Sequence, residues 1–132
     1  MWRDVIPVSP STLTEFEQQF HFRIQSPFRE FLLDHNNGIP SDGTIPTKTK
    51  ERKLSMFLDF SDRNPANSAW TVNKRLRDQI GEKRIVVGRE RSGNLICLER
   101  NYKEQYIVVW SHITGEFERS LLEIPALLQS IN

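Results

Sequence analysis

The apolar positions of this chain are densest between Arg84 and Trp110, where their pattern predicts neighbouring strands. Three runs there are rich in Val, Ile, Leu and aromatic residues: Arg84–Gly88, Asn94–Glu99 and Tyr106–Trp110. Turn-forming residues separate the runs, so we expect an antiparallel meander. In the second and third runs the side chains of both faces are apolar, which predicts central strands that are covered on both sides.

Four helices are predicted around these strands from apolar residues spaced three and four apart. The first begins at Ser9-Pro10, or slightly later at a capping box that starts at Thr12, and ends near Phe20. The second follows Ser26-Pro27 and stops at Asn36-Asn37-Gly38. The third and fourth have the apolar faces Ala69, Val72, Leu76 and Ile80, and Ile124, Leu127, Leu128 and Ile131.

The remaining segments are assigned from composition. Val5-Ile6 is a candidate edge strand and Leu54–Phe60 a candidate strand. The polar Pro46–Lys53 is expected to be a mobile loop, and Ser61–Asn67 a loop with an Asn-Pro turn. The predicted fold class is therefore α+β, with a central, mainly antiparallel sheet and helices packed against it.

The length of 132 residues favours a single domain over residues 1–132. The apolar share of 37% supports one core, and the net charge of +1 argues against a strongly basic nucleic-acid binder or an acidic mimic. The charge is uneven, because Lys48–Arg91 carries 12 basic and 6 acidic residues. This basic middle is either a surface for an acidic partner or a solvated exterior. Its Lys48–Lys53 cluster lacks interleaved aromatics, so direct nucleic-acid binding is not favoured.

The cysteine count and the N-terminus bear on the compartment. One cysteine excludes an internal disulfide framework and fits a reducing environment. The first residues lack the apolar run of a signal peptide, and no stretch approaches the length of a membrane span. We therefore expect a cytoplasmic protein without membrane contact, as a monomer or weak dimer.

Catalytic chemistry has little support in the sequence. Cys97 and His112 are the one pair that could act as nucleophile and base, but Cys97 lies inside a continuous apolar strand. Burial there raises the thiol pKa and makes the group inert. The three His residues lack the spacing of metal ligands, and no phosphate, dinucleotide or hydrolase motif is present. The prediction is no catalysis, no cofactor and no metal.

Residues that could contact a partner gather in three places: the end of the Leu54–Phe60 run, the start of the third helix and the loop inside the meander. Trp70 lies beside the apolar stripe of its helix, and Trp anchors many interfaces. The acidic residues at the strand end form an acid pair or, alternatively, Asp62 caps the turn. The candidates are Asp59, Asp62, Arg63, Trp70, Arg89 and Arg91.

The order of these motifs resembles the SMI1/KNR4 superfamily, also called SUKH. Three pieces carry the resemblance: the helix pair LTEFEQQFHFRIQSPFREFLLDHNNGIP, the core RIVVGRERSGNLICLER followed by YIVVWSH, and the closing apolar helix. They cover nearly the whole chain in the family's order. Two departures lie at Arg89–Gly93, where the family has an acidic, Gly-rich loop, and at Trp110-Ser111, where it has Trp-Asp.

The resemblance implies an α+β fold, no catalysis and a role in binding other proteins. Bacterial members are largely immunity proteins that bind and neutralise a cognate toxin, often a nuclease or deaminase. Fungal relatives act as interaction proteins in cell-wall and signalling regulation. The resemblance thus implies a bacterial immunity protein with a toxin partner. A housekeeping interaction module of the same fold, with no toxin partner, is the alternative.

Overall fold

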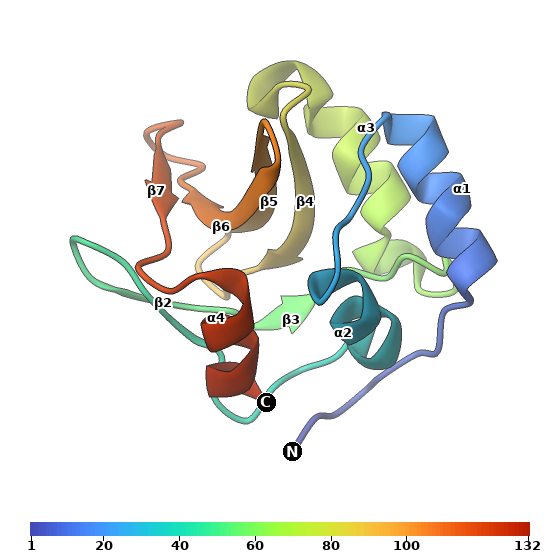
Figure 1. The fold of residues 1–132 in the computed structure, drawn as a ribbon, viewed down its shortest axis with the longest axis horizontal. Coiled ribbons are helices and arrows are strands. Elements are labelled where there is room, and N and C mark those ends of the chain that lie inside the picture. The colour runs from blue at the N-terminus through green and yellow to red at the C-terminus, as the bar shows by residue number, and fades with distance from the viewer.

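A computed structural model describes residues 1–132 and contains four α-helices, one short 3-10 helix and seven strands (Figure 1). In chain order these are α1 (Pro10–Phe20), α2 (Phe28–His35), β1 (Thr44–Pro46), β2 (Glu51–Lys53), β3 (Met56–Phe57), η1 (Pro65–Asn67), α3 (Ala69–Ile80), β4 (Arg84–Arg89), β5 (Leu95–Asn101), β6 (Glu104–Trp110), β7 (Phe117–Arg119) and α4 (Ile124–Ile131). The longest helix has 12 residues, and none combines the length and apolar character needed to cross a bilayer.

Five strands form the main sheet in the order β3-β4-β5-β6-β7, with every neighbouring pair antiparallel. A separate two-stranded sheet pairs β1 with β2. The predicted meander is thus confirmed, and so is the α+β class. Central strand β5 buries Ile96, Cys97 and Leu98 in succession, so both of its faces are covered, as its apolar pattern predicts.

The helices begin and end where local chemistry predicts. The hydroxyl of Ser9 accepts a hydrogen bond from the Thr12 N–H at 3.1 Å, and Pro10 is the first helical residue of α1. Ser68 caps α3 in the same way, at 3.3 Å from the Thr71 N–H. Gly81, at φ +80°, ends α3 as predicted.

One contiguous core holds 29 buried apolar side chains. The helices contribute their Phe residues: the ring of Phe16 meets Phe60 edge-on at 4.7 Å, and Phe28 meets Phe57 at 6.0 Å. Such short helices are marginal alone, so burial of these faces stabilises them.

Helix α3 also closes part of the sheet edge. Strand β3 pairs with β4 only at Met56 and Phe57. Farther along β4, the amide of Asn73 replaces the missing strand, since it accepts from the Val86 N–H at 2.7 Å and donates to the Val86 carbonyl at 3.0 Å. Asn73 is 2% exposed, so these bonds satisfy backbone groups that water does not reach.

Three segment predictions differ from the structure. Pro46–Lys53 is not a mobile loop, because its ends belong to the β1–β2 hairpin and Arg52 is paired with Glu90 and Glu118. Leu54–Phe60 is a strand only at Met56–Phe57, since Asp59 gathers hydrogen bonds from the residues that follow and turns the chain. The N-terminal lead pairs through Arg3 with Ile39, not as a strand around Val5-Ile6.

Candidate protein-binding surfaces

Asp59 lies at the centre of a buried hydrogen-bond network. Its carboxylate accepts from Asn36 Nδ2 at 2.7 Å, from the Ser61 N–H and hydroxyl at 2.8 and 2.6 Å, and from the Asn64 N–H at 2.6 Å. The side chain is 0% exposed. This position excludes the direct partner contact predicted for Asp59, because no part of the carboxylate reaches solvent.

The electrostatics of Asp59 follow from this geometry. Burial alone raises the pKa of the carboxyl, but the donors of Ser61, Asn36 and Asn64 stabilise the charged form more strongly. The pKa of Asp59 therefore lies below its ordinary value. An ionised carboxylate joins the end of α2 to the loop that leads into α3.

The same network fixes the N-terminal lead. Asn36 Nδ2 also donates to the Ile6 carbonyl at 2.9 Å, and Asn37 Nδ2 donates to the Asp4 carbonyl at 2.8 Å. Asn67 of η1 donates in turn to Asn37 Oδ1 at 2.8 Å. Three segments far apart in sequence are thereby held together beneath the Ser61–Ser68 loop.

Asp62 and Trp70 lie together at the surface above this network. Asp62 Oδ1 accepts from the Ser68 hydroxyl at 2.7 Å, which agrees with the turn-capping alternative for this residue. The Trp70 indole N–H donates to the Phe60 carbonyl at 2.9 Å, and its ring meets Phe16 edge-on at 5.3 Å. Trp70 is half-buried, so one side of its ring belongs to the core.

A shallow groove of about 340 Å³ runs along Trp70 and Asp62. Lys74 and Gln19 line it from α3 and α1. Arg63, next in the loop, is exposed and donates to the Pro7 carbonyl. Of the predicted contact residues, Asp62 and Trp70 thus line one groove, and Arg63 follows Asp62 in the same loop.

Arg89 and Arg91 belong to a different part of the molecule, at the end of β4 and in the turn that follows. Arg89 is half-buried, and its Nε has no hydrogen-bond partner. Burial, together with the nearby charge of Arg75, lowers the pKa of Arg89. Arg91 is exposed. The six predicted residues therefore do not form one site.

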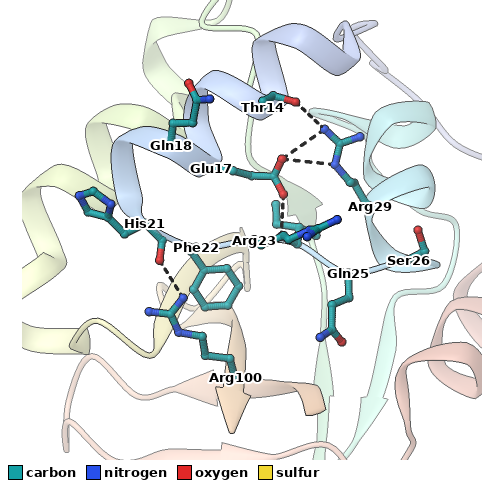
Figure 2. A pocket seen from close by; sticks show the side chains of 11 residues that line it. Thr14, Glu17, Gln18, His21, Phe22, Arg23, Gln25, Ser26, Arg29 and Arg100 are labelled. Atoms are coloured by element: carbon teal, nitrogen blue, oxygen red, sulfur yellow. Dashed lines mark hydrogen bonds and ion pairs between the residues drawn. The ribbon is translucent and has the colours of Figure 1, made fainter. Parts of the chain in front are cut away.

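The largest groove, of about 900 Å³, lies along the link between α1 and α2 and was not predicted from the sequence (Figure 2). At one end the Arg29 guanidinium bonds Glu17 Oε1 at 3.2 Å and the Thr14 hydroxyl at 2.9 Å. Glu17 Oε2 accepts from the Ile24 N–H at 2.7 Å. At the other end Arg100 donates to the His21 carbonyl at 2.7 Å.

The charged groups of Glu17, Arg29 and Arg100 in this groove are thus already engaged with the chain itself. Glu17 and Arg29 fasten the link to α1, and Arg100 stacks on Phe22 with its guanidinium 4.9 Å from the ring centre. Figure 2 shows Glu17 and Arg29 turned toward each other at one end of the groove and Arg100 beside Phe22 at the other, as expected for a structural clamp. The exposed residues of the groove include Gln18, Arg23 and Gln25.

The candidate nucleophile has the properties expected of a structural residue. Cys97 is 0% exposed, and burial raises the pKa of its thiol to about 12. His112 bonds Asn94 Oδ1 through Nδ1 at 2.8 Å. No group of three or more His, Cys, Asp or Glu side chains is placed to hold a metal ion.

Comparison with known protein families gives a match over most of the chain. The model of the SUKH_6 family, described as SMI1-KNR4 cell-wall, matches residues 10–120. This range includes α1, the link, the β1–β2 hairpin and the whole five-stranded sheet. Neither curated proteins nor solved structures gave a match.

Proposed function

The chain belongs to the SMI1-KNR4 (SUKH) family, and we propose that it is a non-catalytic protein-binding domain that serves as an immunity protein. Its partner is a cognate bacterial toxin domain of the nuclease or deaminase type. The observation that carries the proposal is the family match over residues 10–120, because the family is known for immunity proteins.

The geometry of the ionisable groups supports a binding role. The Cys97 thiol is buried and held protonated, and the Asp59 carboxylate is committed to four hydrogen bonds. The Glu17–Arg29 ion pair occupies one end of the largest groove. These groups stabilise the fold, which leaves recognition to the exposed side chains of the loops and the sheet.

Neutralisation in this proposal needs no bond-making. The protein covers the active site or substrate groove of the toxin through an interface of about 1,600 Å² in total, as stable complexes typically do. A half-buried aromatic residue with a polar rim, such as Trp70 beside Asp62 and Lys74, is one arrangement that such interfaces use.

The test is co-expression with the toxin domain encoded by the adjacent gene. We expect the chain to restore growth of cells that produce the toxin, and to co-purify with it. A toxin from an unrelated locus is the control and should still kill. Loss of both rescue and co-purification would contradict the proposal, and a gene neighbourhood without a toxin would favour a housekeeping interaction module.

A further inference from the structure

A row of five half-buried side chains crosses the main sheet from edge to edge. The strand register pairs Met56 with Arg89, Arg89 with Leu95, Leu95 with Trp110, and Trp110 with Phe117. Directly paired residues of antiparallel strands project from the same face, so these five side chains lie next to one another. Each is partly accessible to solvent. We call this row the cross-strand stripe.

The stripe lies on the concave face of the sheet. The Arg84 guanidinium of β4 is 3.7 Å from the centre of the Phe117 ring of β7, although β5 and β6 lie between these strands. The sheet must therefore curl strongly toward this face. Helix α3 lies at the β4 side, and β7 at the opposite end of the sheet (Figure 1).

Positive charge without a counter-charge lies at the β4 position of the stripe, at and beside Arg89. Arg89 is close enough to Arg75 for the two charges to repel, and neither forms an ion pair. Arg91 lies exposed two residues beyond Arg89. The carboxylates of Glu90, Glu99 and Glu118 are already engaged, since Arg52 pairs with Glu90 and Glu118 and Arg84 pairs with Glu99.

Arg89 has no carboxylate partner, unlike three other partly buried arginines. Arg29, Arg52 and Arg84 each bind a carboxylate of the chain. The Arg89 Nε is buried without an acceptor, an arrangement that costs free energy in the unbound protein. An incoming carboxylate would supply the missing charge, and guanidinium–carboxylate pairs are the strongest of the common ionic hydrogen bonds.

We propose that the cross-strand stripe, rather than the groove beside Trp70, is the surface that binds the partner, and that the partner presents an apolar protein segment carrying Asp or Glu side chains. The apolar residues of that segment pack on Met56, Leu95, Trp110 and Phe117, and a carboxylate pairs with Arg89. The inference deepens the proposed function and rests on it, because it names the surface and the chemistry of the partner.

Two other occupants fit the stripe less well. A second copy of the chain would bring the same surface against itself across a two-fold axis, so the interface would hold two copies of Arg89 and Arg75 and no carboxylate paired with either. A nucleic acid would use the arginines, but Met56 and Leu95, the two stripe residues paired with Arg89, offer its bases no aromatic stacking platform there. A protein segment uses both the apolar and the basic parts.

The experiment compares variants of the full chain in titration calorimetry against the toxin domain encoded by the adjacent gene. We expect Arg89→Ala and Leu95→Ser each to weaken binding at least about tenfold, as central interface residues do. Arg23→Ala is the matched control, since Arg23 is an exposed arginine in the groove of Figure 2, and it should change the affinity less than about twofold. If circular dichroism shows that the Arg89→Ala variant does not fold, the Arg89→Lys variant is measured in its place.

The outcomes separate the surface from the function. If the wild-type chain binds the toxin domain and both stripe variants bind it equally well, the partner does not bind at the stripe, and the proposed function stands. If wild type does not bind the toxin domain, the proposed function fails, and a random peptide library displayed on phage then tests the stripe. The stripe is supported as the binding surface if the library yields peptides with Asp or Glu beside Leu, Phe or Trp and these peptides do not bind the Arg89→Glu variant. If no such peptides are enriched, the stripe is not the binding surface.

Two further measurements test whether nucleic acid or a second copy of the chain binds at the stripe. Fluorescence anisotropy with a labelled single-stranded oligonucleotide should show no binding that depends on Arg89. Sedimentation should show no dimer that Leu95→Ser dissociates. Either effect would assign the stripe to nucleic acid or to a second copy and overturn the proposal.

Discussion

Replacing Asp59 by Ala should destabilise the fold more than any surface change. The substitution removes four hydrogen bonds at once and leaves Asn36 Nδ2 and the Asn64 N–H without their acceptor. A hydrogen bond to a charged group contributes about 1.5–3 kcal/mol, and a buried donor left unpaired costs about 1–3 kcal/mol. The four bonds share one carboxylate, so their effects do not add.

We therefore expect a loss of about 3–5 kcal/mol in the free energy of unfolding, the usual cost of breaking a buried charged network. This is a large share of the roughly 5–15 kcal/mol that stabilises a typical domain. Urea denaturation followed by tryptophan fluorescence measures it, since Trp70 is bonded to Phe60 next to the network. With an m-value of about 1.5–2 kcal/mol/M, the midpoint should fall by about 2 M. Asp78→Ala, an exposed aspartate on α3, is the control and should stay within about 0.5 kcal/mol of wild type.

The pH dependence provides a second test of the same reasoning. The hydrogen bonds lower the pKa of Asp59 in the folded protein, so its ionised form contributes stability that is fully present above about pH 4. That contribution is lost as the pH falls through the lowered pKa. The difference between wild type and Asp59→Ala should therefore shrink in acid. A variant within 1 kcal/mol of wild type near pH 7, or a difference that grows in acid, would refute this account of the network.

Further predictions concern the sheet edge, the thiol and two glycines. Asn73→Ala should cost about 2–4 kcal/mol in urea denaturation, because it unpairs two buried backbone groups of β4; an effect below 1 kcal/mol would contradict the edge role. Cys97 should be inert toward a thiol reagent in the folded protein at pH 8, because burial raises its pKa to about 12, and it should react at once in denaturant; rapid reaction of the native state would show that the thiol is accessible. Gly43→Ala should lower the melting temperature strongly, because its Cβ would lie 2.1 Å from the Leu54 carbonyl oxygen; Gly115→Ala, with no atom within 4 Å of the new carbon and only its φ of +74° to strain, should lower it much less.

The helices and central strands could be predicted because each carries its own signal. Ser9-Pro10 and Gly81 mark helix ends through local backbone chemistry, and β5 is apolar at successive positions. These signals depend on neighbours within a few residues. The order of the motifs then predicted the family, which the match over residues 10–120 confirms.

The hairpin and the buried carboxylate depend on distant residues and could not be predicted in this way. Strand β2 reads Glu-Arg-Lys, which is typical of an exposed loop, but Arg52 is held by Glu118, 66 residues later. Asp59 is buried because Asn36, 23 residues earlier, meets it with an amide. The cross-strand stripe depends on the register of five strands, and the bulge between Val86 and Gly88 shifts that register by one residue.

The perimeter of the sheet limits how another chain can attach to it. Along β3 and β4 the outward backbone groups are occupied: the Phe57 N–H donates to the Gly38 carbonyl at 3.0 Å, the Phe57 carbonyl accepts from Asn67, and Asn73 serves Val86. The opposite margin is β7, only three residues long. Few backbone groups at these edges are therefore free to pair with a strand of another protein, a mode of binding that tolerates many sequences. Partner choice then falls to side chains, so a few point substitutions could redirect this scaffold to a new target while its backbone stays unchanged.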